Sequence, residues 1–183
     1  MIPTSLNRRN FLSAGLVAAT LASRPQALAQ SAAVTMPDES SVPFLWGAAT
    51  AGHQIEGNNV ASDIWLLEQV KPTLFSEPSG DACDSFERWH EDIGIARSLN
   101  LNAYRFSIEW SRVEPAERQV SLSALEHYRR MVVACREAGL APILTLSHFT
   151  SPRWFAAKGG WLHHDAPAAF ARHCERVIRH LGD

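Results

Sequence analysis

Short apolar stretches alternate with longer segments of helical periodicity from residue 44 onward, and each stretch is bounded by turn or polar residues. The apolar stretches, which have the length and composition of buried β-strands, cover residues 44–49, 103–108 and 141–146. Apolar residues recur at helical spacing over residues 84–99, 123–138 and 166–181. A repeated strand and helix order predicts parallel strands joined by helical crossovers, which is an α/β fold. Three such units leave a sheet edge that would ordinarily pair with a fourth strand.

The predicted helices carry start and stop signals at their ends. Gly139 and Gly182 follow the second and third helices, where a residue in the left-handed conformation is favoured. Asp165 is the expected N-cap of the third helix, and Pro167 falls in its first turn. These signals agree with the boundaries that the periodicity indicates.

The N-terminal residues have the pattern of an export signal. Residues 8–12 read RRNFL, a mildly apolar run covers residues 14–22, and ALA at residues 27–29 offers a small-residue cleavage site. The paired arginines followed by Phe and Leu resemble a twin-arginine signal. We therefore expect residues 1–29 to be a twin-arginine-type signal peptide and residues 30–41 to be a linker. The alternative is a disordered basic tail.

An export signal of this type has consequences for location and partners. It implies a bacterial protein carried to the periplasm or beyond by the Tat export machinery. The apolar run is shorter than the roughly 20 residues that span a membrane, so no stable membrane anchor is expected. Removal of the first 29 residues leaves 14 basic and 19 acidic residues, a net charge of −5. This acidic balance, without a basic run, disfavours nucleic acid as a partner.

The cysteines and histidines do not form a recognisable metal site. Cys83, Cys135 and Cys174 cannot all pair within one chain, and none stands at metal-ligand spacing from another. We expect buried thiols, with a disulfide as the alternative if the compartment is oxidising. The adjacent His163 and His164 are typical of a solvated loop, and nothing near them in sequence completes a ligand set.

Three blocks of sequence lie at the predicted strands or directly after them. They read PFLWGAATAGHQIEG at residues 43–57, YRFSIEWSR at 104–112, and LTLSHF at 144–149 with KGGW at 158–161. In order and spacing they resemble glycoside hydrolase family 1, the retaining β-glucosidases and their relatives. The resemblance covers about residues 42–183, and three ordered blocks make it more specific than any single one.

The resemblance implies a (β/α)8 TIM barrel, of which this chain would hold about the first three βα units. A complete barrel takes about 250 residues, and this chain has 183. In the family, the next strand carries an Asn-Glu-Pro motif whose glutamate is the general acid/base, and the nucleophilic glutamate lies farther along. We therefore expect both catalytic glutamates beyond Asp183, so the chain alone should be inactive. The expected activity of the whole protein is hydrolysis of terminal β-linked sugars, with no cofactor or metal.

By the same resemblance, Gln54 and His148 match the positions that bind hydroxyls of the sugar in the −1 subsite. Amide and imidazole groups can donate and accept hydrogen bonds, which sugar recognition requires. Arg105 matches the arginine that keeps the nucleophilic carboxylate ionised. Phe149 stands where the family usually has tryptophan, so it keeps an apolar wall for the substrate but lacks the indole N–H. The residues alone, without the resemblance, would favour structural roles for Gln54 and His148, and Arg105 could be an ordinary ion-pair partner.

Three glutamates, Glu56, Glu109 and Glu114, lie near the motifs, and paired carboxylates are typical of glycosidases. The matching family positions are not its catalytic pair, so we expect Glu56 or Glu109 to orient site groups or to pair with Arg105 or Arg112. Trp154 and Trp161 could line the site entrance or pack in the core.

The resemblance thus leads to the hypothesis that the chain is the N-terminal part of an exported retaining β-glycosidase. A noncatalytic carbohydrate-binding module that keeps Gln54 and His148 is the alternative from another class. The open sheet edge argues against it, because unpaired strands favour aggregation. A truncated product without a stable fold is the third option.

Overall fold

A computed structural model describes residues 43–182 of the chain, and the predicted signal peptide and linker lie outside these residues. The described part holds a parallel three-stranded sheet in the order β1-β2-β3. Its strands are β1 (Gly47–Ala49), β2 (Ala103–Ser107) and β3 (Ala141–Thr145). The parallel direction that the alternating pattern predicts is confirmed, and the arrangement is consistent with part of a (β/α)8 barrel.

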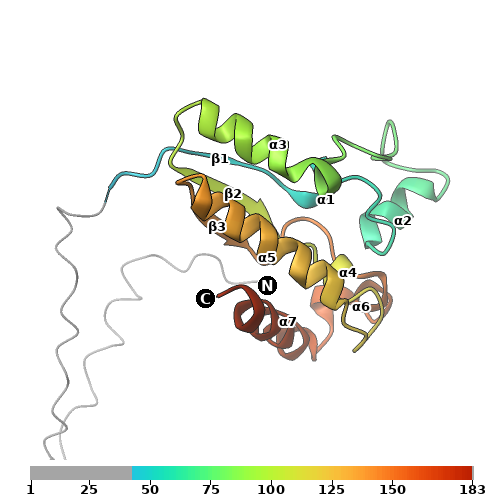
Figure 1. Cartoon of the computed structure of the whole chain (residues 1–183). Coiled ribbons are helices and arrows are strands. Elements are labelled where there is room, and N and C mark those ends of the chain that lie inside the picture. Colours follow the sequence, from blue (N-terminus) through green and yellow to red (C-terminus); the bar gives the residue numbers. More distant parts are fainter. Residues whose placement is uncertain (1–42, 183) are drawn as a thin grey trace, which may run out of the picture. The chain divides into compact units, whose positions relative to one another are not determined.

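The three long helices fall where the apolar periodicity places them, within two residues at each end. They are α3 (Ser85–Ser98), α5 (Leu122–Glu137) and α7 (Ala166–Leu181). Ser121 begins α5 as its N-cap, because its Oγ accepts a hydrogen bond from the backbone N–H of Ala124 at 3.2 Å. In Figure 1, α3 and α5 lie along the sheet, and α7 packs beside α5.

Five short elements occupy the connections that follow the strands. They are α1 (Gly52–Ile55), α2 (Asp63–Gln69), α4 (Trp110–Val113), α6 (Arg153–Ala157) and the 3-10 turn η3 (Gly160–Leu162). Figure 1 shows α1, α2, α4 and α6 at the end of the sheet toward which the strand arrows point. The connections at this end are therefore much more elaborate than those at the opposite end.

The main core lies between the sheet and the long helices. Successive side chains of a strand point to opposite faces, and Tyr104 and Phe106 of β2 pack with Tyr128 and Cys135 of α5. The neighbouring residues of β2, Ala103, Arg105 and Ser107, consequently belong to the other face of the sheet. That face would line the interior of a closed barrel.

A second, aromatic cluster forms around Trp110, the first residue of α4. Its indole is buried, and its Nε1–H donates to Glu114 Oε2 at 3.2 Å. The rings packed around it are Trp154, Phe155, Trp161, Phe170 and His173. Trp154 and Trp161 thus take the packing role that the sequence left open, although Trp161 stays half exposed.

Two expectations about chain ends and edges are wrong. Residues 44–49 were expected to form a buried strand, but β1 begins at Gly47, and Phe44 and Trp46 are exposed. Phe44 and Trp46 precede β1, and their rings lie against each other with centroids 4.9 Å apart instead of joining the core between the sheet and the helices. Gly182 ends α7 with φ of −86°, whereas Gly139 after α5 has the expected left-handed φ of 74°. Asp165 is the N-cap of α7 but makes no side-chain cap hydrogen bond.

The cysteines are all free thiols in the described part of the chain. Cys135 is buried as expected, and burial raises its pKa to about 11. Cys174 is half-buried, and Cys83 is exposed, which corrects the expectation of a third buried thiol. Between residues 43 and 182, no helix has the length and apolar character needed to cross a membrane.

Helix α5 carries a buried histidine, His127, that favours the neutral form. His127 is buried, and its ring stacks on Phe86 with the ring centroids 3.9 Å apart. Burial lowers the pKa of His127 to about 4, and the charges of Arg130 and Arg112 act in the same direction. The folded protein therefore disfavours the imidazolium form of this side chain.

This buried histidine predicts a loss of stability in acid. An unfolded chain binds a proton on His127 near pH 6.5, whereas the folded protein binds it only near pH 4. The stability that the neutral ring contributes is complete above pH 6.5 and is lost as the pH falls toward 4. Between pH 6.5 and pH 4, the free energy of unfolding of the wild type should therefore fall by up to about 3 kcal/mol more than that of His127→Phe. Urea unfolding across the interval tests this, with the exposed His164→Phe as control. Parallel profiles for His127→Phe and wild type would contradict it.

Candidate functional site

The residues expected to form the sugar site lie on the three strands or in the connections that follow them. Gln54 is on α1, directly after β1, and His148 follows β3 by three residues. Arg105 is the middle residue of β2 and pairs in register with Ala49 and Ile143 of the neighbouring strands. In parallel α/β proteins, ligand sites form at the carboxyl ends of the strands. The fold thus places all three residues at or near the edge where a ligand site is expected.

The side chain of Gln54 is exposed at this edge. Its backbone N–H donates to the carbonyl of Ala51 at 3.0 Å, and the buried residues Gly52 and His53 hold the rest of the turn. His53 bonds through Nε2 to Glu68 Oε1 at 2.9 Å, which joins α1 to α2. Glu68 also accepts from the backbone N–H and the hydroxyl of Ser79, at 3.0 and 2.8 Å. The turn that carries Gln54 is therefore anchored while its amide faces solvent.

His148 and Phe149 form the corresponding feature after β3. Their rings meet edge to face with centroids 4.3 Å apart. Phe149 has φ of 64°, a conformation that bulky residues rarely adopt, and its ring is 64 % exposed. Such backbone outliers cluster at functional sites, where surrounding structure holds them in place. An exposed aromatic ring beside a histidine is suited to packing against a sugar ring.

Arg105 has a side chain that the described residues leave partly unsatisfied. It is half-buried on the sheet face opposite the helices, and its Nε atom is buried without a hydrogen-bond partner among residues 43–182. A buried guanidinium nitrogen ordinarily has an acceptor. No ion pair of Arg105 is found in the described structure, so the sequence alternative of a local structural ion pair gains no support.

Glu109 lies at the centre of a buried polar network at the same edge. Its Oε2 accepts from Asn59 Nδ2 at 2.7 Å and from Thr150 Oγ1 at 2.5 Å, and its Oε1 is 3.3 Å from Ser107 Oγ. Asn59 in turn accepts from Ser111 Oγ at 2.7 Å. Burial raises the pKa of Glu109, although the hydrogen bonds from Thr150 and Asn59 oppose the shift.

Glu56 forms a second buried centre next to Glu109. Its carboxylate accepts from Arg112 Nε at 2.7 Å and from the Tyr128 hydroxyl at 3.0 and 3.1 Å. Burial raises the pKa of Glu56 to about 7, the negative charge of Glu109 adds to this, and Arg112 and Tyr128 oppose it. The expected pairing of Glu56 with Arg112 is confirmed. Because both carboxylates are buried and already bonded to protein donors, neither is free to attack a sugar.

Glu114 is the third glutamate near the motifs, and its role is structural. It is buried, and it accepts from Arg176 at 2.9 Å and from the backbone N–H of Arg118 at 2.7 Å, besides Trp110. Trp154 donates its indole N–H to the carbonyl of Glu114 at 2.9 Å. These bonds tie the segment after α4 to α6 and α7.

The residues that hold this network together lie outside the motifs that the sequence shows. Asn59, Thr150 and Tyr128 are separated in sequence by dozens of residues from the carboxylates that they bind. Asn59 and Thr150 are polar residues outside the predicted strands and helices, a position that carries no signal of burial. The one available signal for Tyr128 was its place on the apolar face of the helix predicted over residues 123–138, where a hydroxyl needs a buried partner.

Gly52 allows Glu109 to lie against the backbone of α1. A Cβ added at Gly52 would lie 2.5 Å from Cγ of Glu109 and 2.6 Å from its Oε1. We expect Gly52→Ala to lower the free energy of unfolding by about 1 to 3 kcal/mol, because the carboxyl group cannot move without breaking its bonds. At Gly94 in α3 an added Cβ would meet nothing within 4 Å, so Gly94→Ala should raise stability by about 0.5 to 1 kcal/mol. Equal shifts in thermal unfolding for the two variants would contradict this.

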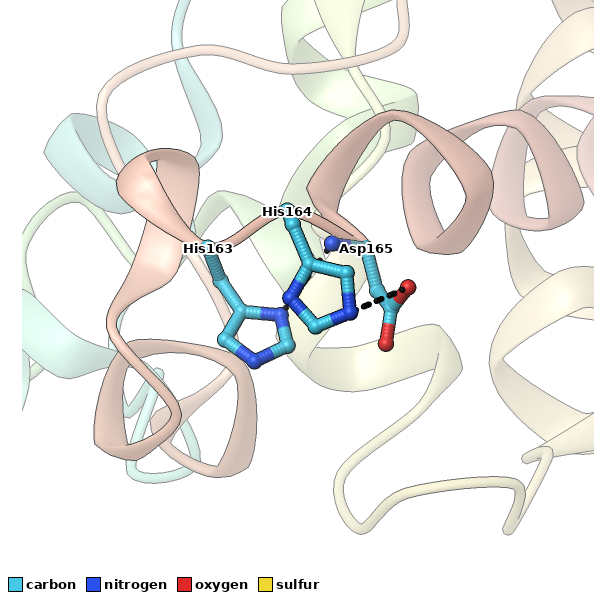
Figure 2. Close-up of side chains that lie close together, drawn as sticks. All are labelled: His163, His164 and Asp165. Carbon is cyan, nitrogen blue, oxygen red and sulfur yellow. Dashed lines mark hydrogen bonds and ion pairs between the residues drawn. The ribbon is translucent and has the colours of Figure 1, made fainter.

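One cluster of potential metal ligands lies apart from these residues. Figure 2 shows His163, His164 and Asp165, whose donor atoms lie within 4.8 Å of one another. His164 Nε2 pairs with the Asp165 carboxylate at 3.1 Å, and His163 Nδ1 accepts from the Asp165 backbone N–H at 3.2 Å. His164 and Asp165 are largely exposed, and Lys158 and Arg172 line the same depression as Asp165. Three donors from one turn, beside two cations, do not make a ligand set selective for a metal.

Comparison with known proteins shows that the chain is similar to β-glucosidases over its described part. Residues 36–183 match the description of glycosyl hydrolase family 1. Beta-glucosidase A of Thermotoga maritima is 37 % identical over 147 residues, which are 76 % of this chain and 33 % of that protein. The thermostable beta-glucosidase B of Thermobispora bispora is 33 % identical over 93 % of this chain and 36 % of its own length. The chain thus spans about a third of the length of the relatives that it matches.

Solved structures of such enzymes have the same arrangement of elements. A structure described as beta-glucosidase 1317 is 57 % identical with a TM-score of 0.76, over 77 % of this chain and 35 % of that one. A β-glycosidase from Pyrococcus horikoshii is 42 % identical with a TM-score of 0.71, over 75 % of this chain and 32 % of that one. Sequence and structure agree, and the chain belongs to glycosyl hydrolase family 1.

Proposed function

We propose that this chain is the N-terminal part of a retaining β-glycosidase that hydrolyses terminal β-linked sugars. The observation that carries the proposal is the placement of Gln54, Arg105 and His148 on three adjacent parallel strands or directly after them. Membership of glycosyl hydrolase family 1 and the β-glucosidase names of the relatives support it. The remaining strands of the (β/α)8 barrel complete the pocket in this proposal.

Each of the three residues has a role in the proposed reaction. Gln54 and His148 bind hydroxyls of the sugar in the −1 subsite, and Phe149 provides an apolar wall. Arg105 lies on the sheet face opposite the helices, and its Nε has no hydrogen-bond partner among the described residues. In the proposal its guanidinium keeps the nucleophilic carboxylate ionised by lowering its pKa. That nucleophile forms a covalent glycosyl-enzyme intermediate, and a second glutamate acts first as acid and then as base. Both glutamates come from the part of the barrel beyond Asp183.

We also propose that residues 1–29 direct export through the Tat machinery and that the mature protein acts in the periplasm or outside the cell. The basis is the sequence RRNFL, the short apolar run and the ALA cleavage site. Changing Arg8 and Arg9 together to lysine tests this proposal. Cell fractionation should show the protein retained in the cytoplasm, and unchanged export would refute it.

An activity assay on the protein purified from the exported fraction of its own host tests the proposed function. Hydrolysis of an aryl β-glucoside, with no hydrolysis of the α-anomer, is the expected result. The intact mass of the same sample distinguishes the alternative. A mass matching residues 30–183 together with sugar binding but no hydrolysis would favour a noncatalytic carbohydrate-binding module. A protein of full barrel length that cleaves neither anomer would refute the proposal.

A further inference from the structure

We propose that Glu109 is a positioning residue that fixes Gln54 and His148 relative to each other by joining the three connections that follow β1, β2 and β3. Its own place in the chain is the second of these connections, two residues after the end of β2. The effect on sugar hydrolysis rests on the proposed function, whereas the effect on loop order does not.

Two contacts join Glu109 to the connection after β1. Asn59 donates to Oε2 at 2.7 Å, and its orientation is fixed because its own Oδ1 accepts from Ser111. Gly52, the first residue of α1, packs directly on the Glu109 side chain, and its N–H donates to Ser107 Oγ at 2.7 Å. Gln54 is two residues from Gly52, so the carboxylate holds the turn that carries the amide.

One short hydrogen bond joins Glu109 to the connection after β3. Thr150 donates to Oε2 at 2.5 Å, and the backbone N–H of Thr150 bonds to the carbonyl of His148 at 2.8 Å. The next residue, Ser151, exchanges two hydrogen bonds with Asp63, at 2.8 and 2.9 Å. His148 and the unusual backbone of Phe149 therefore adjoin a segment that Glu109 ties to the first connection.

A single carboxylate oxygen thus receives donors from two connections that are 91 residues apart in the sequence, at Asn59 and Thr150. Glu109 is only 1 % exposed, so water cannot replace these bonds without opening the site. Loss of the carboxylate would leave two buried donors unpaired. The bonds between Asp63 and Ser151 would still join the two connections, but the link through Glu109, which lies nearer to Gln54 and His148, would be lost. Small displacements of binding groups are costly for catalysis.

A double-mutant analysis of the active protein tests the positioning role. Glu109→Ala should lower kcat/KM for an aryl β-glycoside by about 10- to 100-fold, when rates are normalised to titrated active sites. Glu109→Gln keeps an oxygen for Asn59 and Thr150 and should recover most of this loss. In a protein that already carries Gln54→Ala and His148→Ala, adding Glu109→Ala should cost only a few-fold more. A fully additive loss would overturn the proposal, because a general structural defect does not depend on Gln54 and His148.

Amide hydrogen exchange provides a test that does not depend on activity. In Glu109→Ala, amides of residues 52–59 and 148–151 should both lose protection, while those in the centre of α7 keep theirs. The exposed Glu117→Ala, which removes a carboxylate paired with Lys158, is the matched control and should change neither segment. Unchanged protection of both segments in Glu109→Ala would overturn the proposal. If the wild type is inactive but Glu109→Ala still loses protection in both segments, the proposed function is refuted and the positioning role of Glu109 stands.

Discussion

Replacing Arg112 with methionine is expected to lower the free energy of unfolding by about 3 to 5 kcal/mol, because it leaves a buried carboxylate without its cation. The Arg112 guanidinium binds Glu56 at 2.7 Å, donates to the carbonyl of Gly57, and lies 4.1 Å from the ring centroid of Phe86. Methionine can retain part of the packing on Phe86 but none of the hydrogen bonds. The free energy of unfolding, measured with urea, gives the result directly.

The same variant has a predictable dependence on pH. Glu56 has a pKa raised to about 7, and Arg112 opposes that increase, so the variant should raise this pKa further. The folded variant can avoid the unpaired charge by binding a proton, and its deficit should therefore be smaller at pH 5 than at pH 8. Arg88→Met, which removes an exposed pair with Glu91, should change stability by less than about 1 kcal/mol. A deficit in Arg112→Met no larger than that of Arg88→Met would contradict the account.

The second large effect concerns catalysis. In the complete active protein, Gln54→Ala and His148→Ala should each lower kcat/KM on an aryl β-glycoside by roughly 2 to 4 kcal/mol of transition-state stabilisation. The physical reason is that the proposed hydrogen bonds of Gln54 and His148 to sugar hydroxyls would strengthen as the transition state forms. Steady-state kinetics with both variants measures this loss.

Matched controls exist on the surface of the same chain. Gln69 at the end of α2 and His164 in the loop before α7 are exposed and belong to neither polar network. Gln69→Ala and His164→Ala should therefore keep wild-type kinetics. If Gln54→Ala and His148→Ala also keep wild-type kinetics, the assignment of these two residues to sugar binding is refuted.

Periodicity was sufficient to predict the long helices and the parallel sheet. The apolar repeats over residues 123–138 and 166–181 reproduce α5 and α7 closely, because each of these helices has one face that must pack on the core. The first strand was predicted too long, since periodicity carries no information on whether a strand has neighbours on both sides. Phe44 and Trp46 lie before β1 and pack on each other, outside the core, and both are exposed.

The candidate site was predictable in part. Gln54, Arg105 and His148 were found through a resemblance to a family, and the structure places them near one edge of the sheet. Their supporting network was not predictable, because the hydrogen bonds of Glu109 join residues 50 and 41 positions away in sequence. Local pattern could indicate that Glu109 and Glu56 lie near the site, but only the folded structure shows what each one binds.

The stereochemical course of hydrolysis tests the central claim most directly. Proton NMR of the first sugar released from an aryl β-glucoside by the complete protein distinguishes the two anomers before they equilibrate. A retaining mechanism, with two displacements at the anomeric carbon, must release the β-anomer first. Initial release of the α-anomer would contradict the account, because it would require a single displacement by water and would leave Arg105 without a nucleophilic carboxylate to support.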